Sequence, residues 1–217
     1  MSLMRKLYVY DHCPFCIKAR MIFGLKNIPV EIVVLQNDDE ATPIGMIGQK
    51  MLPILEENGH YLGESLDIIA QIDREGTPLL TVPSRPEVSD WISRSSSLLY
   101  RQFLPRAAAA PFAEFSTTSG RAYFIRKKEA STGPFCTIFN EGPEALLPLN
   151  ALLEDLASLL PEPSALQGAL SYDDIHLFAH LHSFSIIKGL TYPAAVENYR
   201  QALSKRSGIA LLDAIAV

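Results

Sequence analysis

Two cysteines near the start of the chain, Cys13 and Cys16, have the types and spacing for redox chemistry. They lie in the stretch VYDHCPFCIKAR, between a short apolar run and a segment with helical spacing. A thiol at the N-terminal end of a helix faces unpaired N–H groups and the positive end of the helix dipole, which favour a thiolate. We therefore expect Cys13 to be a nucleophile. Cys16 follows about one helical turn later on the same side, within reach for a reversible disulfide.

The composition of the whole chain limits the partners that we expect. The 217 residues carry a formal net charge of −5, with 48% hydrophobic and 20% charged residues. This balance is typical of a globular protein and gives no general attraction to nucleic acid. No stretch approaches the length of an apolar membrane span, and the N-terminus lacks the layout of a signal peptide. We therefore expect a cytoplasmic protein without nucleic-acid or membrane partners.

A structural disulfide and a zinc site fit this cysteine pair less well. Stable disulfides are rare in the cytosol, and the count of three cysteines is odd. A zinc site needs four ligands, of which one CxxC motif supplies two. His176 and His180 have the i, i+4 spacing of helical ligands, with His182 nearby, but on an apolar helix we expect hydrogen-bonded residues at the core edge. We expect no metal, and we expect Cys136 to be a buried small hydrophobe.

The segments around the cysteines predict a β-α-β unit. A strand is predicted over 6–10, a helix begins at Pro14, and a second strand is predicted over 30–35. The crossover between two such parallel strands should be right-handed. Thr42 and Pro43 suit the N-cap and the first position of a short second helix.

A strand, a hairpin and a helix are predicted next. The stretch 50–55 looks like a strand, but Pro53 lies inside it, which suits an edge, a bulge, a tight turn or a cis bond. Asn58 and Gly59 predict the turn of a hairpin, and Ser65 is a plausible N-cap of the following helix. The order β-α-β-α-β-β-α describes a compact mixed-sheet domain.

A proline-rich stretch, GTPLLTVPSRP, separates this domain from a part of the chain with helical patterns alone. We predict a first domain over 4–75, a linker over 76–85 and an all-helical domain over 86–217.

Three helix starts in the second part carry local signals. Ser84 and Glu87 have the spacing of a capping box, as do Ser171 and Asp174. Pro193 suits the first turn of the last helix.

The motif and the order of elements together resemble the thioredoxin fold. CPFC is close to the CPYC of glutaredoxins and differs from the CGPC of thioredoxins. The resemblance extends to the large two-domain glutaredoxins of bacteria through LYVYDHCPFCIKARMIFGLKNIPVE, GQKMLPIL, EFST, KKEAS and LSYDDIHLF. The helical part resembles that of glutathione transferases. One departure is Phe15, where glutaredoxins usually carry a tyrosine whose hydroxyl can touch glutathione.

This resemblance implies a glutathione-dependent thiol–disulfide oxidoreductase. In that activity Cys13 attacks a disulfide or a glutathionylated protein, and Cys16 resolves the mixed disulfide formed with a protein disulfide. Glutathione is the reducing co-substrate. The resemblance also implies that the bond between Leu52 and Pro53 is cis and that this proline faces the active site.

The resemblance assigns glutathione binding to Phe15, Lys50, Leu52, Pro53, Glu64 and Ser65. Glu64 can receive the γ-glutamyl ammonium, while the Ser65 hydroxyl and the helix N–H groups can receive the carboxylate. The backbone of Leu52 can pair with the peptide like an added strand. Lys50 is either a contact for the glycyl carboxylate or a solvated surface lysine. Without the resemblance, Glu64 and Ser65 would be interpreted as an ordinary helix cap.

Two other functions share this architecture. A cysteine-type glutathione transferase has the same two-domain layout but usually lacks the second cysteine. A chloride-intracellular-channel-like protein, which is not an enzyme, carries a CPF-type motif but usually replaces Cys16. We expect a monomer whose partners are glutathione and disulfide-containing or glutathionylated proteins.

Overall fold

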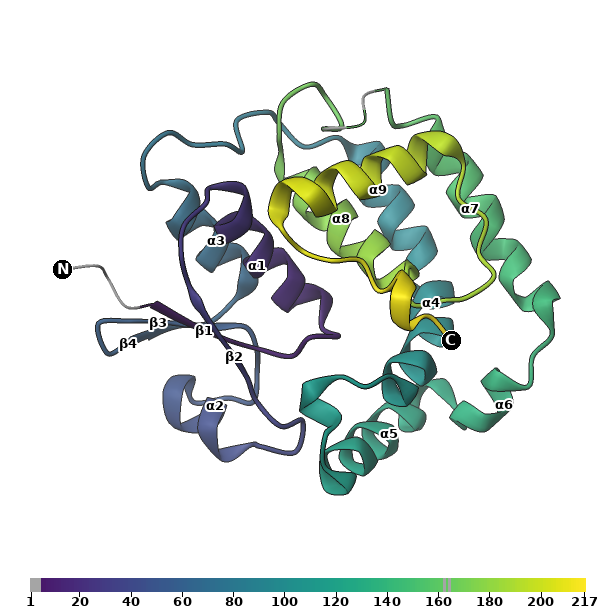
Figure 1. The fold of residues 1–217 in the computed structure, drawn as a ribbon, viewed down its shortest axis with the longest axis horizontal. Coiled ribbons are helices and arrows are strands. Elements are labelled where there is room, and N and C mark those ends of the chain that lie inside the picture. Colours follow the sequence, from purple (N-terminus) through teal and green to yellow (C-terminus); the bar gives the residue numbers. More distant parts are fainter. Residues whose placement is uncertain (1–4, 162, 164) are drawn as a thin grey trace.

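A four-stranded sheet forms the N-terminal part of the chain in a computed structural model, which describes residues 5–161, 163 and 165–217. Its strands are β1 (Arg5–Val9), β2 (Glu31–Val34), β3 (Ile54–Glu57) and β4 (His60–Leu62). The order across the sheet is β2-β1-β3-β4, with β1 parallel to β2 and the other neighbours antiparallel. Figure 1 shows the helices α1 (Pro14–Leu25) and α3 (Ser65–Asp73) on one side of the sheet and α2 (Ala41–Ile47) on the other.

The predicted order β-α-β-α-β-β-α is confirmed, and so is the hairpin turn. Asn58 and Gly59 have φ of 53° and 79° and join β3 to β4, as a two-residue hairpin requires. The bond between Leu52 and Pro53 is cis, as predicted. The placement of Pro53 inside a strand was wrong, because β3 begins only at the next residue.

Two predicted helix caps in this part were also wrong. Helix α2 begins at Ala41 with Glu40 as its N-cap, and the N–H of Thr42 bonds to the Asp39 carboxylate at 3.0 Å. Helix α3 begins at Ser65 itself, and Glu64 is its N-cap. Glu64 takes this position with a φ of 61°, an uncommon conformation for a residue with a side chain.

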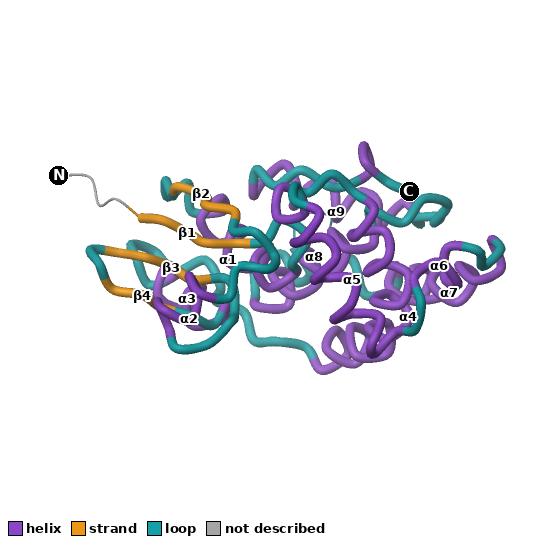
Figure 2. The backbone as a smooth tube through the Cα atoms, turned by 90° about the horizontal axis from the view of Figure 1, so that it is seen from below, coloured by secondary structure: helices purple, strands orange, loops and turns teal. Residues whose placement is uncertain are grey.

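The remaining elements are helices among the residues that the structure describes, apart from an isolated bridge between Val82 and Ser171. They are α4 (Pro86–Ala109), η1 (Ala113–Phe115), α5 (Thr118–Thr132), α6 (Phe135–Phe139), η2 (Pro143–Leu146), α7 (Leu147–Ala157), α8 (Tyr172–Phe184), α9 (Ala194–Ser207) and η3 (Asp213–Ile215). Figure 2 shows the strands gathered at one end of the molecule and these helices at the other. The domain boundaries at 75 and 86 stay a prediction, and Met4, where the first domain was predicted to begin, lies outside the described residues.

The capping signals of the helical part had different outcomes. Ser171 and Asp174 form the predicted capping box of α8, with the Ser171 N–H 2.8 Å from the Asp174 carboxylate. Pro193, predicted in the first turn of α9, lies one residue earlier and is its N-cap. The box of Ser84 and Glu87 was wrong. Helix α4 instead begins at Pro86, whose nitrogen needs no hydrogen-bond partner.

Helix α1 connects the two parts of the molecule. It packs against α3 within the first part and against α8 and α9 of the helical part, and the buried apolar residues form one cluster across both. Gly24 allows the closest approach, since a Cβ atom there would lie 1.8 Å from the backbone oxygen of Ser207 in α9. The helix that carries the cysteines is therefore held from both sides (Figure 1).

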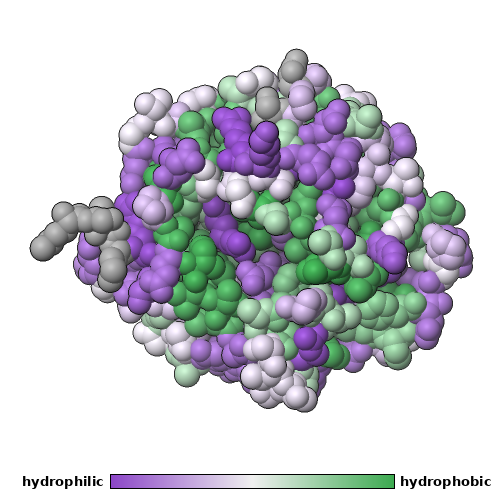
Figure 3. All heavy atoms as spheres, viewed as in Figure 1, coloured by the Kyte–Doolittle hydropathy of each residue, from purple (hydrophilic) through white to green (hydrophobic). Residues whose placement is uncertain are grey.

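The described residues include no helix that is long and apolar enough to cross a membrane. Figure 3 shows polar side chains across one face of the molecule, interrupted by smaller hydrophobic areas. Large exposed hydrophobic residues include Ile32 on the edge strand and Leu147 at the start of α7.

Candidate active site

Cys13 and Cys16 lie where β1 ends and α1 begins. Cys13 is the N-cap of α1 and is half-buried, whereas Cys16 is fully buried one turn later. Pro14 occupies the first turn, and the Cys13 carbonyl accepts the N–H of Ile17 at 3.0 Å. Both thiols are free. The more accessible sulfur is thus at the N-terminus of the helix, where its charge is favoured.

The two thiols differ in their tendency to ionise. A hydrogen bond from Cys16 lowers the pKa of Cys13 to about 6 against the opposing effect of burial, and the charge of His12 and the N–H groups of Cys16 and Phe15 add to this. Burial raises the pKa of Cys16 well above its ordinary value, and the hydrogen bond and charge of Cys13 act in the same direction. The motif therefore contains a thiolate at the surface and a thiol beneath it.

A hollow of about 210 Å³ lies beside the motif, and five of the residues predicted to bind glutathione line it. Its lining is Phe15, Met51, Leu52, Pro53, Glu64 and Ser65. Phe15 is 50% exposed, and the Lys18 ammonium lies 4.8 Å from its ring centre. Met51 is the one lining residue that was not predicted.

A second cavity of about 430 Å³ lies between the sheet and helix α5 and includes Cys13. Its lining is Tyr10, His12, Cys13, Asn37, Lys50, Met51, Leu52, Tyr123, Phe124, Lys127, Lys128 and Ser131. Lys50 lies here and not in the hollow with Glu64. Its ammonium donates to the Asn37 carbonyl at 2.6 Å and lies 3.7 Å from the centre of the Tyr123 ring. Because Met51 and Leu52 line both spaces, the hollow and the cavity form one continuous site beside the thiolate.

The α5 residues of this cavity and His12 were missed by sequence reasoning as site residues. Lys127, Lys128 and Ser131 belong to the KKEAS stretch, which was noted only for its resemblance. A histidine directly before a CxxC motif was an available signal for His12. The α5 residues had no local signal, since they reach Cys13 only through the packing of the two parts.

Glu64 and Ser65 come together at the start of α3. Ser65 is 5% exposed, and Glu64 is exposed and has a φ of 61°. Backbone strain of this kind persists where the surroundings over-determine it, and it occurs often at ligand sites. The strained step directs two polar side chains and the free N–H groups of the helix start toward the same hollow.

The remaining cysteine and the histidines of α8 do not line the two spaces beside Cys13. Cys136 was wrongly expected to be buried. It is exposed, because its neighbours Phe135 and Ile138 form the buried face of α6. Burial lowers the pKa of His180 and His182 to about 3 and that of His176 to about 4. The described residues contain no cluster of three or more side chains suited to hold a metal ion.

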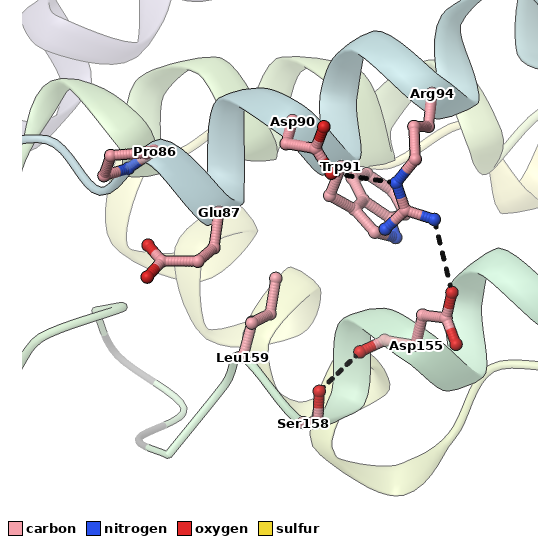
Figure 4. A pocket seen from close by; sticks show the side chains of 8 residues that line it. All are labelled: Pro86, Glu87, Asp90, Trp91, Arg94, Asp155, Ser158 and Leu159. Carbon is pink, nitrogen blue, oxygen red and sulfur yellow. Dashed lines mark hydrogen bonds and ion pairs between the residues drawn. The ribbon is translucent and has the colours of Figure 1, made fainter.

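A pocket of about 460 Å³ lies away from the cysteines, between the first turns of α4 and the end of α7 (Figure 4). Arg94 pairs with Asp90 on its own helix at 3.0 Å and reaches across the pocket to Asp155 of α7 at 3.4 Å. No thiol lines it, and Arg94, Asp90 and Asp155 bind one another. This pocket therefore offers no group for thiol chemistry.

Comparisons with known proteins find relatives that match almost the whole chain. The family described as "Glutathione S-transferase, N-terminal domain" matches residues 7–77, and "Glutaredoxin 2, C terminal domain" matches residues 87–216. Glutaredoxin 2 of Escherichia coli strain K12 is 44% identical over 214 residues, which are 98% of this chain and 100% of the relative.

Solved structures give the same result. A crystal structure of Glutaredoxin 2 from Salmonella typhimurium in complex with glutathione matches with a TM-score of 0.96 and 48% identity, over 98% of this chain and 99% of that one. A glutathione S-transferase from Ceriporiopsis subvermispora matches with a TM-score of 0.74 and 17% identity, over 96% and 99% of the two chains. The second match shows a shared fold alone.

Proposed function

The chain belongs to the glutaredoxin 2 family and is a glutathione-dependent thiol–disulfide oxidoreductase, and we propose that Cys13 is its nucleophile and Cys16 its resolving thiol. The observation that carries this assignment is the opposite shift of the two pKa values, lowered for Cys13 and raised for Cys16. The thiolate is the attacking species in thiol–disulfide exchange. Family membership leaves the cysteine-type transferase and the channel-like protein without support.

Reduction of a glutathionylated protein needs Cys13 alone. Its thiolate attacks the glutathione sulfur of the mixed disulfide, the protein leaves as a thiolate, and a disulfide forms between Cys13 and glutathione. A second glutathione thiolate attacks the glutathionyl sulfur, so that oxidised glutathione leaves and the Cys13 thiolate is restored. One disulfide is broken and one is formed in the whole cycle.

Reduction of a protein disulfide needs both thiols. Cys13 attacks one sulfur of the substrate, and Cys16 then attacks the Cys13 sulfur, which frees the substrate dithiol and closes a Cys13–Cys16 disulfide. The Cys13 charge is one of the causes that raise the pKa of Cys16. The first attack removes that charge, so Cys16 ionises more readily when it is needed. Two glutathione molecules then reopen the bond through a glutathionyl–Cys13 intermediate.

We propose that glutathione binds along the hollow and cavity that share Met51 and Leu52. Its γ-glutamyl end would meet Glu64 and Ser65, where a carboxylate and a helix start match an ammonium and a carboxylate. The backbone of Leu52 would pair with the central peptide, beside Pro53. The contact of Phe15 would be its ring face, which has no hydroxyl to donate.

Lys50 suits the glycyl end of glutathione. Its ammonium lies in the Cys13 cavity, where it already donates to the Asn37 carbonyl at 2.6 Å. We further propose that the substrates are disulfide-containing or glutathionylated proteins and that the protein acts as a cytoplasmic monomer. The dependence of the cycle on reduced glutathione, which the cytosol maintains, supports that location.

Activity measurements on Cys16→Ser test the assignment of roles. The variant should keep reduction of a glutathione mixed disulfide and lose most reduction of a protein disulfide. If both activities disappear while the variant stays folded, Cys16 has another role. If both persist, no resolving thiol is needed.

A further inference from the structure

A buried carboxylate of the helical part, Glu114 in η1, reaches His12 beside the reactive cysteine. One of its oxygens, Oε1, accepts both the backbone N–H of His12 at 2.9 Å and the ring Nδ1 at 2.7 Å. Glu114 is completely buried and His12 is 7% exposed. The two residues are 102 positions apart in the sequence, so the packing of the two parts creates the pair.

The surroundings of this pair are almost entirely aromatic. The His12 ring lies 4.9 to 6.4 Å, between ring centres, from the rings of Tyr10, Phe103, Phe112, Phe115 and Phe124. The second oxygen of Glu114, Oε2, has no hydrogen-bond partner in the part of the chain that the structure describes. A buried carboxylate is costly unless a partner compensates its charge, and His12 is its one ion-pair partner among those residues.

Glu114 is held in its charged form by this histidine. Burial alone would raise the pKa of Glu114, but the hydrogen bond and charge of His12 outweigh it and hold the pKa below its usual value. A carboxylate that accepts a hydrogen bond from Nδ1 also fixes which ring nitrogen carries the proton. The pair thus has a defined orientation and a defined charge distribution.

We propose that Glu114 is a positioning residue for the reaction: its carboxylate accepts the Nδ1 proton of His12 and favours the imidazolium form, protonated on both nitrogens, beside the Cys13 thiolate. This inference rests on the proposed function, since it takes Cys13 as the nucleophile. It also gives the helical part a role, because the carboxylate that completes the site comes from η1. Isolation of the first domain would then remove part of the active site.

The direction in which the pKa of Cys13 changes separates a role of Glu114 through His12 from a direct effect of its own charge on Cys13. The positive charge of His12 lowers the pKa of Cys13. The negative charge of Glu114 has the opposite sign, and its direct effect on the neighbouring thiol, Cys16, is to raise the pKa. Removal of the Glu114 charge should therefore raise the pKa of Cys13 if Glu114 acts through His12, and lower it if Glu114 acts directly.

Other charged or titratable groups face the same two residues and stay in place in the test. Lys18 of α1, Tyr100 of α4 and Tyr10 at the end of β1 interact electrostatically with the Cys13 sulfur. Asp11 interacts with the charges of His12 and Glu114, and it pairs with Arg20 at 3.0 Å. None of these supplies a hydrogen bond to the His12 ring.

The test follows alkylation of Cys13 by iodoacetamide across pH, with the Cys13 peptide quantified by mass spectrometry. Glu114→Gln keeps an oxygen acceptor but removes the charge. In this variant the midpoint of the rate profile should rise by about one pH unit, which is the lower end of the pKa change that a nearby opposite charge produces. An unchanged or lowered midpoint would overturn the proposal.

Two further variants make the test specific. Asp11→Asn removes a carboxylate from the same neighbourhood without changing the hydrogen bond to Nδ1, and it should not raise the midpoint. His12→Gln should raise the midpoint of the alkylation profile. Adding Glu114→Gln to that variant should not raise the midpoint further. An equal rise with Asp11→Asn, or a further rise in the double variant, would contradict a role through His12.

A measurement on the unchanged protein covers the case in which Glu114→Gln does not fold. Nitrogen-15 spectra of the His12 ring should show protons on both Nδ1 and Nε2 at the pH where Cys13 is a thiolate. A neutral ring at that pH, with a proton on one nitrogen alone, would overturn the proposal. The alkylation assay needs no glutathione, so a reactive Cys13 in a protein without glutathione-dependent turnover would count against the proposed function alone.

Discussion

His12 and His180 lie in similar surroundings in two regions of the molecule. They are 7% and 6% exposed, both are ringed by aromatic side chains, and both contact helix α4. Each ring makes a hydrogen bond of ordinary length. The partner of His12 is the Glu114 carboxylate at 2.7 Å, and the partner of His180 is the Ser95 hydroxyl at 2.8 Å.

The difference teaches that the charge of the partner, more than burial or bond length, determines what a buried histidine does. Burial without a carboxylate partner lowers the pKa of His180 to about 3, so the ring is a neutral packing group. His12 has a carboxylate partner, and its charge lowers the pKa of Cys13. One region thus contributes to reactivity and the other to stability.

The largest expected effect comes from removing the thiol on the reactive side of this comparison. Cys13→Ser should abolish turnover of both mixed disulfides and protein disulfides, because the two other thiols lack its position at the helix N-terminus. A coupled assay with glutathione, glutathione reductase and NADPH measures this. The matched control is Cys136→Ser, which removes an exposed thiol far from the motif and should keep full activity. Turnover by folded Cys13→Ser would refute the assignment.

The contact that brings the two regions together should be the next most sensitive. In Gly24→Ala the new Cβ would lie 1.8 Å from the Ser207 backbone oxygen, which no side-chain movement relieves. We expect a loss of about 3 kcal/mol or more in the free energy of unfolding by urea. Gly45→Ala is the control, since a Cβ there meets nothing within 4 Å. Equal stability of the two variants would show that α1 and α9 are not tightly held.

Acid should destabilise the region of neutral histidines. The folded-state pKa of His180 and of His182 is about 3, below the ordinary 6.5, so the unfolded chain takes up their protons first. Stability is therefore complete above pH 6.5 and falls as the pH decreases toward 3. At pH 5 each of these two histidines should lower the free energy of unfolding by about 2 kcal/mol relative to its value at neutral pH.

Urea unfolding of the parent and of His182→Gln at pH 7 and pH 5 tests this dependence. The variant should lose less stability between the two pH values than the parent does. His60→Gln, which changes an exposed histidine of β4, should behave like the parent. A parent whose stability is the same at both pH values would show that these rings are not buried as neutral groups.

The smallest effect concerns a carboxylate that is neither fully buried nor paired. Glu64 makes no ion pair with the residues that the structure describes, and we assign it to the ammonium of glutathione. Glu64→Gln should weaken glutathione binding by about 1 kcal/mol, somewhat above an exposed pair because the ligand shields it. Calorimetry measures this against Asp67→Asn, which removes a charge from the same first turn of α3. Equal affinity of Glu64→Gln and the parent would place the γ-glutamyl end elsewhere.

The sequence predicted the features that depend on nearby residues. The CxxC motif at a helix start, the hairpin turn at Asn58 and Gly59 and the capping box of α8 each follow from a few adjacent side chains. The errors at Thr42 and Ser65 are shifts of two residues and one residue, because several polar residues near each helix start compete as caps.

The features that depend on long-range packing were not predictable in the same way. The pair of His12 and Glu114 joins positions 102 residues apart, and EFST was noted only for its resemblance to known sequences. The exposure of Cys136 depends on which face of a short helix is buried. For such features the sequence gives residue types but not their neighbours.

The most direct test of the central assignment is to locate the glutathionyl adduct. The protein would be equilibrated in glutathione buffers of decreasing potential, quenched in acid and digested, and its cysteine peptides identified by mass spectrometry. We predict an adduct on Cys13 and a Cys13–Cys16 disulfide that replaces it as the buffer becomes more oxidising. An adduct on Cys16 or Cys136 with Cys13 unmodified, or the absence of any adduct and of the disulfide, would contradict the assignment.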